Sequence, residues 1–185
     1  RKMVEMFAKY LKKKVTQWSI GVARKPKYGG DTNTPITDEG VALVKKFEGC
    51  PTEDGVAVAY QCAAGVWTCG YGSTRGVKQG DVWSLEKAEE MLISELEEYG
   101  HHVSNLVTVP LEQCQFDALT SWCFNLGPTN MQSSTMLKVL NQGNYEEVPS
   151  QLKRWNKVNG QVNDGLIRRR EAEALLFEGK NWEMI

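Results

Sequence analysis

Carboxylates are the best candidates for catalysis in this chain, because the motifs of other common chemistries are missing. The sequence has no phosphate-binding G-x-x-x-x-G-K-S/T loop, no G-x-G-x-x-G turn, no H-E-x-x-H pair and no G-x-S-x-G nucleophile turn. Its two histidines, His101 and His102, follow Gly100, and we expect them to cap a helix end, where the helix dipole favours positive charge. Metal and triad chemistry are therefore disfavoured.

Glu48 is the carboxylate whose position suits proton transfer. It follows Phe47 at the end of a predicted helix and precedes a run of short strands, so it should lie at the hinge of two lobes. A carboxyl group among apolar and aromatic neighbours keeps its proton more readily, and it can then donate that proton to a leaving oxygen. The alternative is an ordinary surface acid at a helix end.

Periodicity and capping signals predict the elements that must position Glu48. A helix begins at the N-cap Thr37, has a hydrophobic staple between Ile36 and Val41, and ends around residues 48–49. Residues 50–82 alternate glycines with short apolar runs, which predicts a meander of strands. Further helices are predicted over residues 84–99 (ending at Gly100), 111–126, 134–142, 145–155 and 165–178. This order predicts an α+β fold with a small antiparallel β lobe, a larger helical lobe and a cleft between them.

The chain should contain one main domain and an N-terminal appendage. It has 185 residues, 41% of them hydrophobic, which suffices for one full core, and no apolar run is long enough to cross a bilayer. Residues 1–30 carry nine Lys and Arg against one acid, a net charge of +8. Because the whole chain has a net charge of −1, the remaining residues carry −9. Because the chain begins with Arg1 rather than Met, we expect a processed or truncated product.

Residues 1–34 form the predicted appendage, and residues 35–185 form the main domain. Residues 1–18 have the pattern of an amphipathic basic helix, and residues 24–35 have the Pro, Gly and polar composition of a linker. We interpret the basic helix as a surface for a membrane or an anionic polymer. The alternative is a helix that packs on the main domain.

Three separated parts of the sequence resemble one known family. They are FEGC at 47–50 with AYQCAAGVWTCGYGST at 59–74, QFDAL at 115–119 with FNLG at 124–127, and RWN at 154–156 with GLIRRREAE at 165–173. In this order they closely resemble the phage-type lysozymes of glycoside hydrolase family 24, which include T-even phage lysozyme and the lambdoid endolysins. The similarity covers residues 36–180, and it implies a lysozyme-like fold.

The resemblance also implies three catalytic residues. Glu48 matches the family's general acid and Thr68 its active-site threonine, whereas Cys62 stands where most members have an aspartate. A thiol or thiolate at this place could hold or activate the attacking water, and the Thr68 hydroxyl could hydrogen-bond the same water. Thirteen residues separate Glu48 from Cys62, more than in the family pattern, which we interpret as an insertion around residues 51–55.

Each of these roles has an alternative. Glu53 or Asp54, in the insertion, could be the missing carboxylate. Cys62 could be a buried apolar thiol, or a regulatory disulfide with another of the five cysteines could capture it. Thr68 could simply pair across a sheet.

Four further residues are predicted to contact the substrate: Trp67, Tyr71, Asn125 and Arg168. The two aromatic residues could line a sugar-binding cleft or pack in the core of the sheet, and Asn125 could instead cap the central helix. The arginines at 168–170 cannot all face one way on a helix. One of them should therefore reach a carboxylate, and another should approach the peptide acids of the polymer.

The function implied by the resemblance is that of a peptidoglycan muramidase. It would hydrolyse the β-1,4 bond between N-acetylmuramic acid and N-acetylglucosamine by acid-assisted attack of water, with inversion and without a metal or organic cofactor. Bacterial peptidoglycan is the expected partner, and residues 1–18 would add an anionic envelope or membrane surface. We expect a monomer that binds no nucleic acid and acts on the cell wall after release from the host cytoplasm or export into the periplasm. The alternatives are a wall-binding module without catalysis, a membrane-active N-terminal helix and a lytic transglycosylase.

Overall fold

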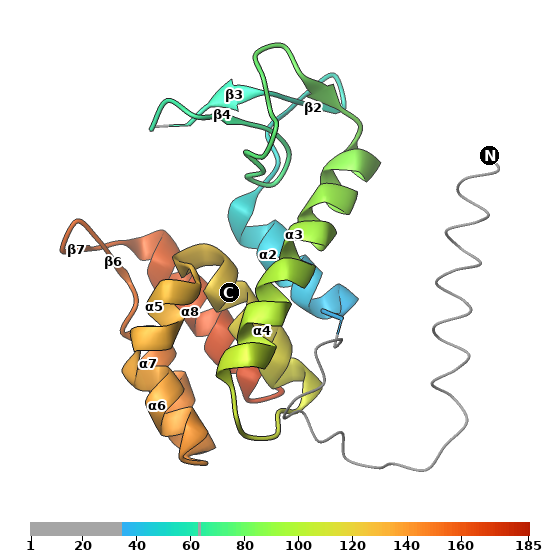
Figure 1. Cartoon of the computed structure of the whole chain (residues 1–185). Helices are drawn as coiled ribbons and strands as arrows, with labels where there is room; N and C mark the ends of the chain where they lie inside the picture. Colours follow the sequence, from blue (N-terminus) through green and yellow to red (C-terminus); the bar gives the residue numbers. More distant parts are fainter. Residues whose placement is uncertain (1–34, 63) are drawn as a thin grey trace, which may run out of the picture.

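Two lobes make up the part of the chain that the computed structural model describes, residues 35–62 and 64–185. Short strands gather in a small upper lobe and most helices in a larger lower lobe, and helices α2 (Asp38–Glu48) and α3 (Leu85–Leu106) lead from one lobe to the other (Figure 1). This arrangement confirms the predicted α+β architecture. The predicted basic helix over 1–18 and nearly all of the predicted linker lie outside the described residues.

Helix α2 begins and ends as its sequence predicts. Thr37 is its N-cap, and the side chain of Thr37 accepts a hydrogen bond from the backbone N–H of Gly40. The helix ends at Gly49, whose φ of 67° lies in the left-handed region that glycine adopts without strain. Glu48 is therefore the last helical residue, at the point where the chain turns into the β lobe.

The β lobe is built from very short antiparallel strands. Strands β1 (Thr52–Glu53), β2 (Val56–Val58) and β5 (Val82–Trp83) form one sheet in the order β1-β2-β5, and β3 (Tyr60–Gln61) pairs with β4 (Trp67–Thr68). The insertion at 51–55 forms β1 and its turn toward β2, with Asp54 and Gly55 both at positive φ. The predicted meander is confirmed, and the insertion lies on its exposed side.

The helical lobe contains the remaining elements. They are α4 (Gln113–Leu126), α5 (Pro128–Ser133), α6 (Thr135–Asn141), the 3-10 helix η1 (Tyr145–Glu147), α7 (Val148–Lys153), the hairpin β6 (Lys157–Val158) with β7 (Gln161–Val162), and α8 (Asp164–Phe177). Helix α5 and the hairpin were not predicted, because each consists of few residues and has no apolar period of its own. None of the helices among the described residues is both long and apolar enough to cross a membrane.

The prediction that a helix ends at Gly100 is wrong. Helix α3 continues through Gly100 to Leu106, and a Cβ atom at Gly100 would lie 3.0 Å from Cζ of Phe116 in α4. Glycine is therefore needed here for the close packing of α3 on α4. As a result, His101 and His102 are exposed residues inside the helix and do not cap its end.

Helix α4 lies at the centre of the helical lobe. Most of its side chains are buried, among them Phe116, Leu119 and Trp122. Asp117 is also buried, at 1% exposure, and it ties α4 to the start of α2. The backbone N–H and the hydroxyl of Thr37 donate hydrogen bonds to its two carboxylate oxygens, and the Gln113 amide donates a third at 2.9 Å.

Replacing Asp117 with alanine should therefore destabilise the domain. The change leaves part-buried donors on Thr37 and Gln113 without an acceptor, and we expect the free energy of unfolding to fall by about 1–3 kcal/mol. Asp117→Asn keeps one acceptor oxygen and should lose less. Denaturant unfolding of the two variants measures this difference, and equal losses would contradict this role of the carboxylate.

The difference in stability between the wild type and Asp117→Asn should depend on pH. Burial raises the pKa of Asp117, against the hydrogen bonds from Thr37 and Gln113, which lower it. The folded state then binds more protons than the unfolded state as the pH rises through the ordinary aspartate range. The stability of the wild type relative to Asp117→Asn should fall over that interval. Unfolding curves collected from acid to neutral pH test the sign.

Candidate active site

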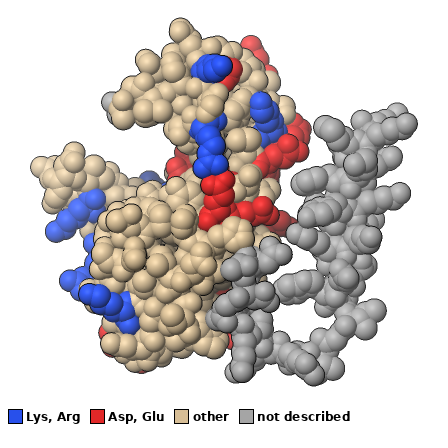
Figure 2. Space-filling model, viewed as in Figure 1, with Lys and Arg blue, Asp and Glu red and all other residues tan. Residues whose placement is uncertain are grey.

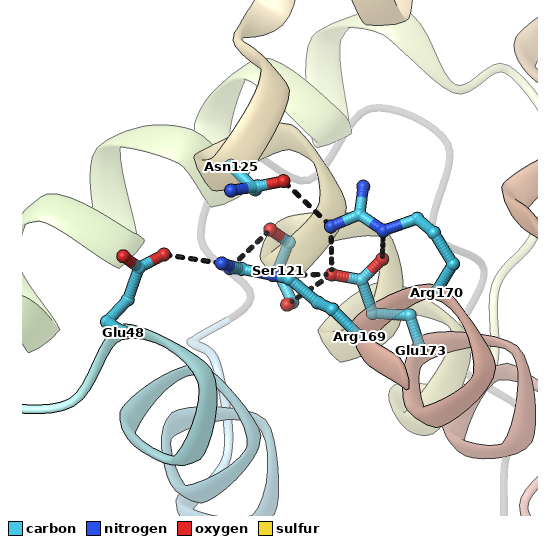
Figure 3. Close-up of polar contacts among 6 residues, drawn as sticks. All are labelled: Glu48, Ser121, Asn125, Arg169, Arg170 and Glu173. Carbon is cyan, nitrogen blue, oxygen red and sulfur yellow. Dashed lines mark hydrogen bonds and ion pairs between the residues drawn. The ribbon is translucent and has the colours of Figure 1, made fainter. Parts of the chain in front are cut away.

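The carboxyl group of Glu48 lies between Arg169 and the turn that contains Gly72. Its Oε1 accepts a hydrogen bond of 2.6 Å from Nη1 of Arg169 in α8, and the side chain of Glu48 is 23% exposed (Figure 3). Its Oε2 faces the turn after β4, where a Cβ atom built on Gly72 would lie 3.7 Å away. Glu48 therefore lies where the two lobes meet, as predicted, but its nearest charged neighbour is a guanidinium rather than the apolar surroundings that were expected.

Arg169 is itself fixed by a buried polar network. Its Nε lies 3.2 Å from Oε1 of Glu173, which also accepts a hydrogen bond of 2.8 Å from the Ser121 hydroxyl. Arg170 pairs with the same carboxylate through Nε at 3.0 Å and donates a bond of 2.9 Å to Oδ1 of Asn125 (Figure 3). Burial lowers the pKa of Arg170 to about 10, although the charge of Glu173 opposes this. The network thus balances two arginines with two glutamates, one of which is Glu48.

Cys62 and Thr68 meet in the β3–β4 hairpin. The backbone N–H of Cys62 donates to the Val66 carbonyl at 3.0 Å, and the Thr68 hydroxyl lies 3.1 Å from that same carbonyl oxygen. Hydrogen bonds from the backbone of Val66 and Ala64, and then from the Thr68 hydroxyl, lower the pKa of the Cys62 thiol. The hairpin therefore stabilises a thiolate at position 62.

Cys62 differs in this respect from the other cysteines. All five cysteines belong to the described residues and all are free thiols. Burial raises the pKa of Cys50, Cys69, Cys114 and Cys123, in the last case to about 12. Of the five, Cys62 is the thiol whose pKa the surrounding structure lowers. The disulfide considered from the sequence stays a prediction.

Tyr60 lies in β3, two residues before Cys62, and the sequence analysis did not name it as a candidate. Partial burial raises its pKa, and the charges of Cys62, Glu48, Cys50 and Cys69 raise it further. Tyr60 is 38% exposed and stands opposite Thr68 in the strand register. The signal was available, because residues two apart on a strand share a face and Tyr60 is two residues before Cys62.

The four predicted substrate contacts lie in different surroundings. Trp67 is half-buried against the small core of the β lobe, and Asn125 accepts from Arg170 rather than capping α4. Tyr71 faces a groove of about 620 Å³ between α2 and α3, and Nζ of Lys45 lies 5.5 Å from the centre of its ring. Arg168 is exposed at the start of α8. No contact joins these four to Glu48, and their role in substrate binding stays a prediction.

Both alternative carboxylates are exposed: Glu53 is the last residue of β1, and Asp54 lies in the turn that follows. The groove beside Tyr71 is lined by neither Glu48, Cys62 nor Thr68. Cys62 and Thr68 therefore share the β3–β4 hairpin, Glu48 ends α2 where the chain enters the β lobe, and all three lie apart from that groove.

Comparison with known proteins assigns the chain to a family. Residues 45–173 match the model of the phage lysozyme family. The chain belongs to the phage lysozyme family. It is therefore a glycoside hydrolase, as the sequence resemblance implied.

Relatives with full-length matches support this assignment. The chain is 41% identical over 147 residues to the endolysin of Acyrthosiphon pisum secondary endosymbiont phage 1, covering 77% of this chain and 97% of that protein. It is 38% identical to the SAR-endolysin of Pseudomonas phage phiKMV, covering 76% and 89% of the two chains. Among solved structures, the muramidase domain of SpmX from Asticcacaulis excentricus superposes with a TM-score of 0.72 at 38% identity, covering 78% and 98%.

Replacing Thr68 should change the reactivity of Cys62. Thr68→Val removes the hydroxyl that helps to stabilise the thiolate, so the pKa of Cys62 should rise toward its ordinary value. The alkylation rate of Cys62 by iodoacetamide, followed by peptide mass spectrometry, should then reach its midpoint at a higher pH. Thr68→Ser keeps a hydroxyl and is the control. A profile unchanged in Thr68→Val would rule out this contact.

Removing the buried acid of the network should be costly. Glu173→Gln leaves Arg169 and Arg170 with Glu48 as the remaining acid, and we expect the free energy of unfolding to fall by about 3–5 kcal/mol. Glu171, two residues earlier on the same helix, forms an exposed ion pair with Lys153. Glu171→Gln is the matched control and should change stability by less than about 1 kcal/mol. Similar losses in the two variants would contradict the buried network.

Proposed function

We propose that this lysozyme hydrolyses the β-1,4 bond between N-acetylmuramic acid and N-acetylglucosamine in peptidoglycan, with Glu48 as the general acid and with Cys62 and Thr68 at the attacking water. The observation that carries the proposal is the placement of the Glu48 carboxyl at the junction of the lobes, where it accepts a hydrogen bond from Arg169 and faces the turn at Gly72.

The first step of the proposed reaction is proton transfer from Glu48 to the glycosidic oxygen. This breaks the bond between that oxygen and the anomeric carbon of the muramic acid residue, through an oxocarbenium-like transition state. The proton leaves a carboxylate on Glu48, next to the guanidinium of Arg169 at 2.6 Å. Arg169 therefore stabilises the form of Glu48 that the step produces.

Water completes the reaction from the other face of the sugar. The Cys62 thiolate accepts a proton from the water as its oxygen bonds to the anomeric carbon, and the Thr68 hydroxyl orients that water. The lowered pKa of Cys62 supports this role, because it favours the thiolate form. Solvent then returns the proton from the thiol to Glu48. Attack opposite to the leaving group gives inversion.

The proposed site of action is the bacterial cell wall. Relatives named SAR-endolysins support delivery of this enzyme to the periplasm by export, with release from the host cytoplasm as the other route. The +8 charge of residues 1–30 supports contact with anionic envelope surfaces. We further propose that the enzyme acts as a monomer.

Mass spectrometry of the fragments released from purified peptidoglycan tests the reaction. The wild type in H₂¹⁸O should release muropeptides with a reducing N-acetylmuramic acid that carries the label. Glu48→Gln should slow release by about 10²-fold or more. Anhydro ends would identify a lytic transglycosylase instead, and release unchanged in Glu48→Gln would overturn the assignment of the acid.

Two substitutions separate a catalytic Cys62 from a structural one. Cys62→Ala should reduce turnover by about 10²-fold, because the group that accepts the proton of water is lost. Cys62→Asp supplies the residue that most family members have at this place and should retain activity. If Cys62→Ala were as active as the wild type, the thiol would have no part in the reaction.

A further inference from the structure

The hairpin β6–β7 is an exposed ribbon on the helical lobe. All four strand residues are exposed, including Val158 at 50% and Val162 at 58%. Its two-residue turn, Asn159–Gly160, has positive φ at both positions, the geometry that such tight hairpins prefer. Figure 1 shows the hairpin at the edge of the helical lobe, below β3 and β4. The fold thus presents two valine side chains to solvent at half or more of their surface, in a defined shape.

Three cations without acidic partners surround this hairpin. Arg154 precedes it, Lys157 lies within it and Arg168 follows it, and all three are exposed. Among the described residues none of the three forms an ion pair, whereas the nearby Lys153 is paired with Glu171. Figure 2 shows blue side chains along the side of the lower lobe where Figure 1 draws the hairpin, with few red ones among them.

This local charge is opposite to that of the protein around it. Residues 31–185 carry a net charge of −9, so unpaired cations gathered at one edge mark a surface for an anion. Arg168 also precedes Arg169, the residue that holds Glu48 at 2.6 Å. Arg168 is thus adjacent in the sequence to the residue that binds Glu48. Figure 2 shows a notch between the two lobes on this same side of the molecule.

We infer that the hairpin with Arg154, Lys157 and Arg168 forms a basic lip that binds the stem-peptide carboxylates of the peptidoglycan strand beside the bond to be cleaved. The inference rests on the proposed function, because it takes peptidoglycan as the polymer in the cleft. The three cations bind the peptide carboxylates, and Val158 and Val162 contact the aliphatic side chains of the same peptides. The lip thus recognises the peptide, while the site at Glu48 acts on the sugar.

Sedimentation with insoluble wall tests the basic lip. The triple variant Arg154→Gln, Lys157→Gln, Arg168→Gln is compared with the wild type on peptidoglycan freed of teichoic acids, in short incubations on ice. A matched control replaces Lys78, Lys138 and Lys180, three exposed lysines outside the lip, with Gln. The lip variant should bind about tenfold more weakly, and the control should bind within about twofold of the wild type.

The wall is altered in parallel to identify the anion. Treatment with carbodiimide and methylamine converts the peptide carboxylates to neutral amides. The wild type should lose about tenfold in affinity on this wall, and the lip variant should lose little more, because the two changes remove the same interaction. Equal further losses in both proteins would overturn the inference, as would tighter binding of the wild type to phosphatidylglycerol vesicles that depends on the lip.

The outcome is separable from that of the proposed function. Binding is measured without turnover, and release of fragments by the wild type is measured on the same wall at its working temperature. Absence of release, with binding that still depends on lip and carboxylates, would overturn the muramidase proposal alone. Normal release with binding indifferent to the lip substitutions would overturn the lip alone. Unfolding curves of both triple variants confirm that the fold is retained.

Discussion

One ion pair sets the geometry on which the rest of the site depends. Glu48 ends the helix that leads into the β lobe, and Arg169 lies on the last helix, 121 residues further along the chain. The Arg169 side chain is only 4% exposed, and Arg169 shares Glu173 with Arg170. Without Glu48 the cluster would keep one buried positive charge in excess, at a cost of about 3–5 kcal/mol. The carboxyl of Glu48 is therefore drawn to one place by the need to neutralise that charge.

Glu48, the proposed general acid, is in this way part of the charge balance of the core. Arg169 and Arg170 are matched by Glu173, which is fully buried, and by Glu48, which remains partly open to solvent. A buried ionic network is often no more stable than apolar residues of the same volume. In this enzyme the network fixes the positions of its side chains. Ser121 hydrogen-bonds Glu173, Arg170 hydrogen-bonds Asn125, and Arg169 hydrogen-bonds the partly exposed Glu48.

The elements that sequence predicted well are those specified locally. Caps at Thr37 and Ser84 hydrogen-bond their own first turns, so the residues that start each helix are sufficient to predict it. The end of α3 was mispredicted because Gly100 serves a contact with Phe116 on another helix. For the site, motif resemblance pointed to Glu48, whose partner could not be chosen among three consecutive arginines. That choice depends on how α8 packs against α4, which is a tertiary property.

The distribution of charge explains how an acidic domain can work on an acidic polymer. Electrostatic forces between exposed charges are screened over about 8 Å at physiological ionic strength, so the net charge matters less than the charges nearest the bound strand. Helix α3 holds many of the glutamates, and two of them are already paired, Glu89 with Lys45 and Glu98 with Arg75. Figure 2 shows red side chains over α2 and α3, on the side away from the hairpin β6–β7. The unpaired cations stand at the opposite edge, on the lobe that carries Arg169.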